Sequence, residues 1–145
     1  MIKIPTRVLL VDDEKDFLEV MSDRMTARGM DVSTAESAQE ALQKVEAGSY
    51  DAIVLDLMMP NMDGFAVLDE LKNDPRTSKI PVVIVSAKTL KPAEYAKLRN
   101  SAESVWQKGN FSARELVSHV VTIVEPEVEL DTQSVITPEP STAEE

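Results

Sequence analysis

Apolar and polar residues alternate along the chain in two distinct patterns. Three short segments are apolar almost throughout, which is typical of strands covered on both faces of a sheet, and two further segments are partly polar. The stretches between them carry apolar residues at helical spacing, which predicts amphipathic helices. The predicted strands are 7–11, 31–34, 52–55, 81–85 and 104–107, and the predicted helices are 15–28, 38–47, 65–73, 92–99 and 113–124.

Several predicted helices carry capping residues at their ends. Ser37 with Glu40, and Ser112 with Glu115, have the spacing of a capping box, in which both side chains bond to free backbone N–H groups of the first turn. Gly29 follows the first helix, at the C′ position where glycine is favoured. These signals support the boundaries predicted from the apolar pattern.

Strict alternation of strands and helices predicts the fold class. Five strands that alternate with five helices form a parallel sheet with helices on both faces, which is a doubly wound α/β fold. In such sheets the ligand site lies at the carboxyl ends of the strands. The residues that directly follow each strand are therefore the first candidates for function.

Charged and hydroxyl side chains follow four of the five predicted strands. The acidic residues 12–14 follow the first strand, Asp56 the third, Ser86 the fourth and Lys108 the fifth. Each could by itself be a helix N-cap or a surface residue. Because the four strand ends lie on one rim of the sheet and carry complementary groups, together they favour a binding site.

The chemistry of this predicted cluster favours phosphoryl transfer. Carboxylates that lie close together raise one another's pKa unless a cation neutralises them. Mg²⁺ takes one or two carboxylates together with water and phosphate oxygens. A carboxylate nucleophile can form an aspartyl phosphate, while Mg²⁺ and an ammonium group stabilise the charge on the phosphoryl oxygens. We therefore expect Mg²⁺ as the cofactor.

Composition excludes several other classes of protein. The 145 residues include no cysteine and one histidine, so thiolate and multi-histidine metal sites are excluded. A formal net charge of −11 argues against nucleic-acid binding, which needs a basic surface. No apolar run is long enough to span a membrane, and the N-terminus lacks the apolar stretch of a signal peptide. We expect a cytoplasmic protein.

The negative charge is concentrated in the last 21 residues. Residues 125–145 contain seven acidic residues, no basic residue and three prolines, which predicts an acidic disordered tail or linker. The remaining residues, 1–124, carry a net charge of −4 and form the predicted folded domain.

Four segments resemble one known family, the receiver domains of two-component response regulators, of which CheY is an example. They are VLLVDDE (8–14), VLDLMMPNMDGF (54–65), VSA (85–87) and QKG (107–109). The resemblance extends from about residue 7 to residue 124. It implies a flavodoxin-like or CheY-like (βα)5 fold with strand order 2-1-3-4-5.

The resemblance also implies a role for each motif residue. Asp56 would accept a phosphoryl group from a histidine kinase or a histidine phosphotransfer protein. Ser86, Ala87 and Lys108 would contact the phosphoryl group. Mg²⁺ would be held by Asp13 directly, by Asp12 through water, by Asp56, and by the backbone carbonyl of Met58. Asp63 and Gly64 would be a cap and a turn before the next helix.

The chain departs from the family pattern at three places. Gly109 replaces the usual proline after the lysine, so a cis peptide bond is not expected there. Val105 occupies the place of an aromatic switch residue, and strand alternation directs Trp106 to the opposite face. Met58 and Lys88 occupy two positions that influence the rate of phosphoryl hydrolysis in this family. We expect slow hydrolysis, because Met58 cannot orient a water molecule.

The single histidine, His119, is not expected to be a phosphodonor. It falls on the predicted helix 113–124 opposite the apolar residues, so we expect an exposed surface side chain. The chain also lacks the helical hairpin that would present a phosphodonor histidine.

Three alternatives share this fold class, which alone does not determine function. A haloacid-dehalogenase-like phosphatase needs an Asp-x-Asp signature, but Met58 stands two residues after Asp56. A flavin- or dinucleotide-binding domain needs a glycine-rich loop, but the four glycines form no such motif. A non-phosphorylated adaptor with the receiver fold remains open, because Val105 and Gly109 depart from the family pattern.

The resemblance implies signalling through protein–protein interaction rather than enzymatic output. The domain would catalyse only its own phosphorylation and dephosphorylation, and it would be a monomer or a weak homodimer through the face formed by the fourth helix, fifth strand and fifth helix. It could stand alone or be part of a hybrid histidine kinase.

Overall fold

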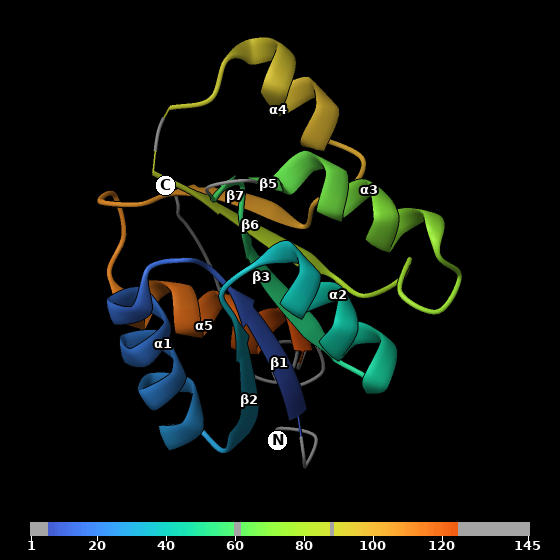
Figure 1. Ribbon diagram of the computed structural model, residues 1–145. Helices are drawn as coiled ribbons and strands as arrows, with labels where there is room; N and C mark the ends of the chain where they lie inside the picture. The colour runs from blue at the N-terminus through green and yellow to red at the C-terminus, as the bar shows by residue number, and fades with distance from the viewer. Residues whose placement is uncertain (1–5, 60–61, 88, 125–145) are drawn as a thin grey trace.

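The computed structural model describes residues 6–59, 62–87 and 89–124, and they form a five-stranded parallel sheet flanked by helices (Figure 1). The strand order is β2-β1-β3-β6-β7, which confirms the expected order 2-1-3-4-5. The strands are β1 (Thr6–Val11), β2 (Met30–Ala35), β3 (Ala52–Asp56), β6 (Val82–Ser86) and β7 (Ser104–Gln107). The helices are α1 (Lys15–Ala27), α2 (Ala38–Ala47), α3 (Gly64–Asn73), α4 (Pro92–Leu98) and α5 (Ala113–Val124).

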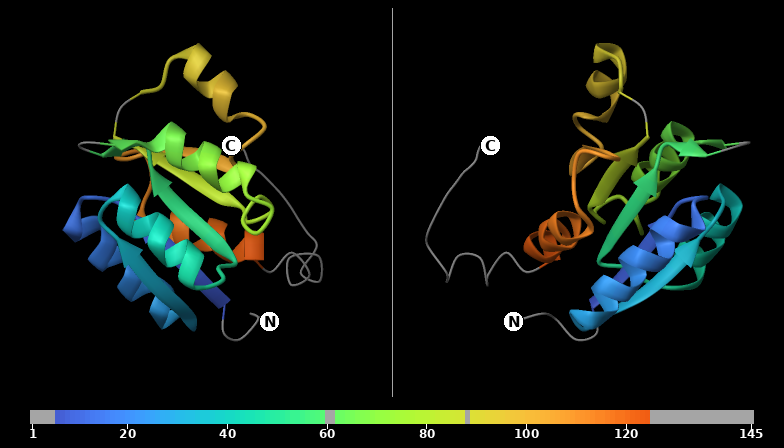
Figure 2. Two further views of the ribbon diagram at one scale, coloured as in Figure 1. Left: turned by 45° about the vertical axis from the view of Figure 1, so that its right-hand side comes forward. Right: turned by 90° about the vertical axis from the view of Figure 1, so that its left-hand side faces the viewer.

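Alternate residues of the central strands enter two separate cores. Leu9 and Val11 of β1 pack with residues of α2, α3 and α4 on one face of the sheet. Val8 and Leu10 pack with residues of α1 and α5 on the other face. Figure 2 shows this layering, with α5 on one side of the strands and α2 and α3 on the other. Burial on both faces explains why the central strands are apolar almost throughout.

Helix ends follow the predicted capping residues closely. Ser112 and Glu115 form a complete capping box, because each backbone N–H donates to the other residue's side chain. At α2 the Ser37 hydroxyl accepts from the Glu40 N–H, but the Glu40 carboxylate accepts from the N–H of Glu36. Gly29 has φ of 92° after α1, a conformation that glycine adopts without strain.

A short antiparallel hairpin was not predicted from the sequence. It is formed by β4 (Met58–Met59) and β5 (Met62–Asp63), between β3 and α3. Asp63 caps α3, because its carboxylate accepts from the N–H of Phe65 at 2.9 Å. A Cβ atom on Gly64 would lie 2.5 Å from the Cα of Leu57, so this close approach requires glycine.

His119 is half-buried, so the prediction of an exposed side chain is wrong. Its Nε2 lies 2.7 Å from the hydroxyl of Ser104, and its ring lies 5.0 Å from that of Trp106. The reason is the pleat of β7, which directs residues 104 and 106 toward α5. Trp106 also packs against Phe111, while Val105 packs into the opposite core, as expected.

Some sequence-based expectations concern residues that the structure does not describe. Lys88, the segment 60–61 and the acidic segment 125–145 lie outside the described residues. In the described part of the chain, no helix combines the length and the apolar character needed to cross a bilayer.

Candidate functional site

Three aspartates converge at the carboxyl ends of two neighbouring strands. Asp12 and Asp13 follow β1, and Asp56 is the last residue of β3. One carboxylate oxygen from each lies within 4.8 Å of the other two. Asp12 is fully buried and Asp56 is 2% exposed, whereas Asp13 remains in contact with solvent. The parallel pairing of β1 with β3 brings these residues together although they are more than forty positions apart.

Local hydrogen bonds orient the two buried carboxylates in the same way. Asp12 Oδ1 accepts from the backbone N–H of Glu14 at 2.8 Å. Asp56 Oδ1 accepts from the backbone N–H of Met58 at 2.9 Å. Each aspartate thus uses one oxygen to hold the turn that follows its strand. The second oxygen of each, Oδ2, lies on the side of Lys108.

Lys108 brings the positive charge of the site from the end of β7. Its backbone N–H donates to the carbonyl of Ser86 at 2.7 Å, which joins the ends of β7 and β6. Its ammonium nitrogen lies 2.6 Å from Asp12 Oδ2 and 3.7 Å from Asp56 Oδ2. The same ammonium also pairs with the Glu14 carboxylate. Lys108 therefore partly neutralises the acidic cluster.

Two neighbours of Lys108 were not assigned a role from the sequence. Glu14 was noted only as part of the acidic run, yet its exposed carboxylate binds Lys108. The ring of Phe17 lies 4.5 Å from the ammonium nitrogen, within reach of a cation–π interaction. Its apolar character and its position in the predicted helix 15–28 indicate only a core residue. The sequence signal for both is their position in the first turns after the acidic strand end.

Burial dominates the electrostatics of Asp56. The pKa of Asp56 is raised from 3.8 to about 6, chiefly by loss of solvent and also by the neighbouring Asp12 carboxylate, against the opposing effects of the Met58 N–H and Lys108. Burial lowers the pKa of Lys108, but its bonds to Asp12 and Glu14 outweigh burial and hold this pKa above its ordinary value. At neutral pH the site therefore contains Lys108 in its charged form and an Asp56 that is largely ionised at a cost in stability.

This cost predicts a pH-dependent stability in the absence of Mg²⁺. In the unfolded chain the pKa of Asp56 returns to 3.8, so the folded state binds the proton more tightly and loses stability as the pH rises from 3.8 to about 6. A tenfold difference in proton affinity corresponds to about 1.4 kcal/mol, so the loss is on the order of 3 kcal/mol. In urea unfolding, the variant Asp56→Asn should therefore have a free energy of unfolding about 3 kcal/mol above that of the parent at neutral pH. Below pH 3.8 the two should differ little.

The exposed Asp69 of α3 provides a matched control for this prediction. Asp69→Asn removes the same charge from the surface and should leave the free energy of unfolding unchanged within about 0.5 kcal/mol. Mg²⁺ should stabilise the parent chain more than the Asp56→Asn variant. Equal stability of Asp56→Asn and the parent at neutral pH would contradict the electrostatic description of the site.

The remaining predicted site residues lie at the ends of β3 and β6. Ser86 is the buried last residue of β6, the strand that pairs with β3, and Ala87 follows it in an exposed position. Met58 is 45% exposed and lies directly after the Asp56 turn. Gln107, next to Lys108, donates from its side-chain amide to the hydroxyl of Thr89 at 3.0 Å. This last contact was not predicted from the sequence.

The donor set fits a hard divalent cation. All three clustered side chains are carboxylates, and a site rich in carboxylate oxygens is typical of Mg²⁺. Two of them are buried, and among the described residues Lys108 is the ammonium group that contacts them, so these carboxylates retain negative charge that a cation would neutralise. The residues present therefore fit Mg²⁺.

Comparison with known proteins agrees with this site. The family model described as "Response regulator receiver domain" matches residues 8–121, which is most of the chain. The chain belongs to this family. The matched segment contains all three aspartates, Ser86 and Lys108, so the family assignment covers the whole of the site. The receiver domain is a signalling module of two-component systems.

Curated relatives of this receiver domain are longer proteins. It is 43% identical over 81 residues to "Response regulator PleD" from Caulobacter vibrioides, which covers 56% of the chain and 18% of that relative. It is 33% identical over 119 residues to "Transcriptional regulatory protein CpxR homolog" from Haemophilus influenzae, which covers 82% of the chain and 50% of that relative. The chain thus spans half or less of the length of these relatives.

Solved receiver domains share the fold along nearly their whole length. The Francisella response regulator 1452 receiver domain is 29% identical, with a TM-score of 0.74 over 84% of this chain and 98% of that one. A CheY-like receiver domain protein from Methanospirillum hungatei is 20% identical, with a TM-score of 0.77 over 86% of this chain and 97% of that one. The latter supports the fold alone.

Proposed function

We propose that this receiver domain accepts a phosphoryl group on Asp56 from a phospho-histidine of a histidine kinase or phosphotransfer protein. The observation that carries the proposal is the convergence of three carboxylates and one lysine at the carboxyl edge of the sheet. A structural ion pair would need one carboxylate for one lysine. The excess of negative charge favours a divalent cation, which together with Lys108 would also offset the charge of a phosphoryl group on Asp56.

The reaction requires Asp56 as the nucleophile. A carboxylate oxygen of Asp56 attacks the phosphorus of the phospho-histidine, the new O–P bond forms, and the P–N bond breaks. The imidazole nitrogen keeps the electron pair of the broken bond and takes up a proton from solvent. The pKa of about 6 leaves Asp56 largely ionised at neutral pH, which the attack requires.

Mg²⁺ would be held by Asp12, Asp13 and Asp56, together with the backbone carbonyl of Met58. When bound, it supplies positive charge to the phosphoryl oxygens and neutralises the carboxylate cluster. The Asp12 side chain is already fixed by the N–H of Glu14, so it supports a preorganised site.

Lys108, Ser86 and Ala87 would bind the phosphoryl group once it is on Asp56. The Lys108 ammonium, now shared by Asp12 and Glu14, would form a charge-assisted bond to a phosphoryl oxygen. Ser86 would donate its hydroxyl to a second oxygen, and Ala87 would contribute its backbone N–H. Movement of Ser86 toward the phosphoryl group would then shift the start of α4.

The proposal is tested by incubation with acetyl phosphate or a phospho-histidine protein, with and without Mg²⁺. Intact-protein mass spectrometry should show a single phosphoryl adduct that needs Mg²⁺ and disappears when the metal is chelated. Failure of both donors would instead favour the adaptor, for which the valine at position 105 is the supporting observation.

The proposal extends to the bounds of the receiver domain and to the kind of output that it would have. We assign residues 1–124 to the receiver domain and 125–145 to a tail or linker, in a cytoplasmic protein that catalyses only its own phosphorylation and dephosphorylation. Its output would be a phosphorylation-dependent protein contact, as a monomer or a weak homodimer through the α4–β7–α5 face.

Met58 predicts slow loss of the phosphoryl group. Its backbone N–H donates to Asp56, and its exposed thioether cannot orient an attacking water molecule by a strong hydrogen bond. In Met58→Asn the amide could do so, and one added hydrogen bond of about 1 kcal/mol would speed autodephosphorylation by a factor of about 5. Met58→Leu is the matched control and should leave the rate unchanged. Decay of the adduct by mass spectrometry measures both, and equal rates in all three proteins would refute this role.

A further inference from the structure

Three arginines line a cleft between α1 and α5, away from the phosphoacceptor site. Arg24 lies in the last turn of α1, Arg28 is its C-terminal cap, and Arg114 lies in the first turn of α5. Ala27 and Val117 complete the lining of this cleft, which has a volume of about 320 Å³. None of the residues proposed to bind Mg²⁺ or phosphate takes part. We call this hollow, lined by Arg24, Arg28 and Arg114, the arginine cleft.

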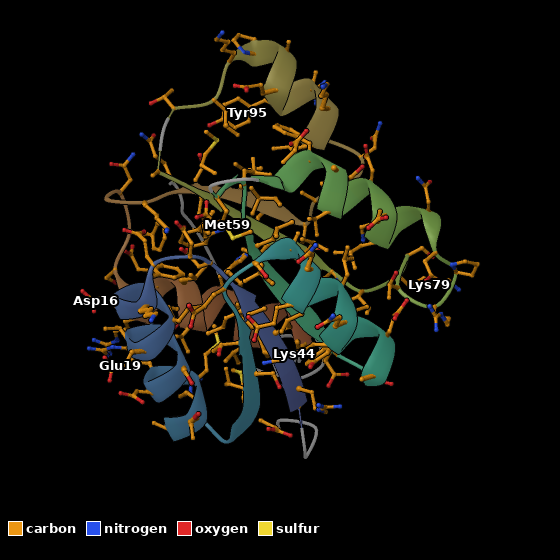
Figure 3. The ribbon with its side chains drawn as sticks, viewed as in Figure 1. Asp16, Glu19, Lys44, Met59, Lys79 and Tyr95 are labelled. Atoms are coloured by element: carbon orange, nitrogen blue, oxygen red, sulfur yellow. The ribbon has the colours of Figure 1, made fainter. Side chains whose placement is uncertain are left out.

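The three guanidinium groups have no polar partner among the described residues. None of them forms an ion pair or a hydrogen bond with another residue described here. Helix α1 has three acidic side chains. Asp16 and Glu19 lie in its first half and point outward (Figure 3), and Asp23 lines a different hollow together with Glu19. The cations that are paired among the described residues are Arg7, Lys44, Arg76 and Lys108.

Helix electrostatics explains only part of this arrangement. Arg24 and Arg28 stand at the C-terminal end of α1, where a cation interacts favourably with the helix dipole. Arg114 stands in the first turn of α5, where the same dipole disfavours a cation. Three like charges around one cleft also repel one another. The cleft is therefore suited to an anionic partner that offsets both costs.

We propose that the chain's own acidic segment, 125–145, folds back along α5 and binds in the arginine cleft. This segment begins directly after α5 and carries seven acidic residues and no basic one. Its first four acids alternate along the chain at positions 125, 127, 129 and 131. In an extended conformation alternate side chains project to one side, so these carboxylates can face the same surface.

The length of the segment matches the path that it has to cover. Residues 114 to 124 of α5 span about 15 Å at the helical rise. Residues 125 to 131 span about 20 Å when extended, so the alternating acids can run antiparallel to α5 as far as Arg114. Arg24 and Arg28 line the same cleft as Arg114, so the acid at 131 and the later acids at 139, 144 and 145 lie within reach of all three arginines.

A second cleft near α5 is less suited to the same segment. It is lined by Lys72, Lys79 and Glu103 among other residues, and Figure 3 shows Lys79 on the loop after α3, on the other side of the molecule from α1. Lys72 already donates to the carbonyls of Ser78 and Ile80. Glu103 adds a negative charge there. The arginine cleft thus offers more unpaired positive charge to an acidic segment.

A spin label in the tail tests this contact in the full chain. The chain has no cysteine, so Ser134→Cys provides a single attachment site. Because the tether keeps the segment at an effective concentration on the order of 1 mM, we expect the amide signals of residues 24–28 and 114–117 to fall about twofold or more. The effect should disappear near 1 M salt, where the Debye length is about 3 Å.

Charge variants of the spin-labelled chain separate the proposal from nonspecific attraction. Replacing Arg24, Arg28 and Arg114 by glutamine should abolish the signal loss, as should replacing the acids at 125–131 by their amides. Replacing Lys91, Lys97 and Arg99 of the α4 region by glutamine changes the net charge by the same amount. This variant should keep the signal loss of the parent chain.

Three outcomes would overturn the proposal. They are signal loss confined to the end of α5, signal loss at residue 79 and residues 100–103, and signal loss that survives the arginine substitutions. A spin-labelled chain mixed with an isotope-labelled chain without the spin label should show no effect. Signal loss in that mixture would place the segment on a second copy and contradict the intrachain contact.

Discussion

Replacement of Asp56 by asparagine is expected to abolish phosphorylation of the receiver domain. The amide keeps the size of the side chain but lacks the carboxylate oxygen that attacks phosphorus. Incubation with Mg²⁺ and acetyl phosphate should give the phosphoryl adduct of the parent chain in intact-protein mass spectrometry and no adduct in Asp56→Asn. This is the largest effect we expect from any single substitution, because no neighbouring carboxylate can replace the nucleophile without losing its role toward Mg²⁺.

Loss of the adduct in this variant will not be an effect of unfolding. Burial of the ionised Asp56 destabilises the fold at neutral pH, so the asparagine variant should be at least as stable as the parent. Asp69→Asn, on the exposed face of α3, should be phosphorylated like the parent. An adduct that forms equally in Asp56→Asn would mean that another residue accepts the phosphoryl group.

Replacement of Lys108 by methionine is expected to lower the rate of phosphorylation by about 10² to 10³, as for other groups that stabilise charge in a transition state. Methionine fills a similar volume but carries no charge. The same change should strengthen Mg²⁺ binding, because the Lys108 ammonium contacts Asp12 and lies near Asp56, where it competes with the metal. Rapid-quench kinetics with acetyl phosphate measures the phosphorylation rate. Titration of the Trp106 fluorescence with Mg²⁺ measures the metal affinity.

Opposite changes in rate and metal affinity distinguish Lys108 from a structural residue. Without Mg²⁺ the variant leaves two buried carboxylates without their cation, at a cost of about 3 kcal/mol or more, and saturating Mg²⁺ should restore most of that stability. The exposed Lys15 of α1 supplies the control, since Lys15→Met should change none of the three quantities. A variant that binds Mg²⁺ more weakly and is phosphorylated at the parent's rate would contradict the proposed role.

The central elements of the fold follow from the sequence because both of their faces are buried. The apolar runs within β1, β3 and β6 have no polar position that faces solvent, so neither strand face is ambiguous. Helix ends were predictable where a side chain itself forms the cap, as Ser112 does for α5. The sheet order came from the family resemblance rather than from periodicity.

Elements defined by tertiary contact were not predictable in this way. The hairpin of β4 and β5 has strands of two residues each, too short to produce an alternating pattern. The helical position of His119 indicated a solvent-facing side chain, but Ser104 and Trp106 of β7 cover it. A helical wheel describes one helix and not the strand packed against it.

For the candidate site, the sequence predicted which residues meet but not how they pair. The strand ends placed Asp12, Asp56 and Lys108 on one rim, and the structure brings them within contact of one another. The bond between Lys108 and Glu14 depends on rotamers and on the path of the loop after β1, which no spacing rule describes. The hydrogen bond from Gln107 to Thr89 depends in the same way on the loop before α4.

The most direct test of Asp56 as the phosphoacceptor identifies the phosphorylated residue chemically. Borohydride reduces an aspartyl phosphate to homoserine and leaves free carboxylates unchanged, so peptide mass spectrometry can locate the modified position. After incubation with acetyl phosphate, we expect homoserine at position 56 in the presence of Mg²⁺ and none after chelation. Homoserine at position 12 or 13 instead, or at no position in a chain that carries the phosphoryl adduct, would contradict it.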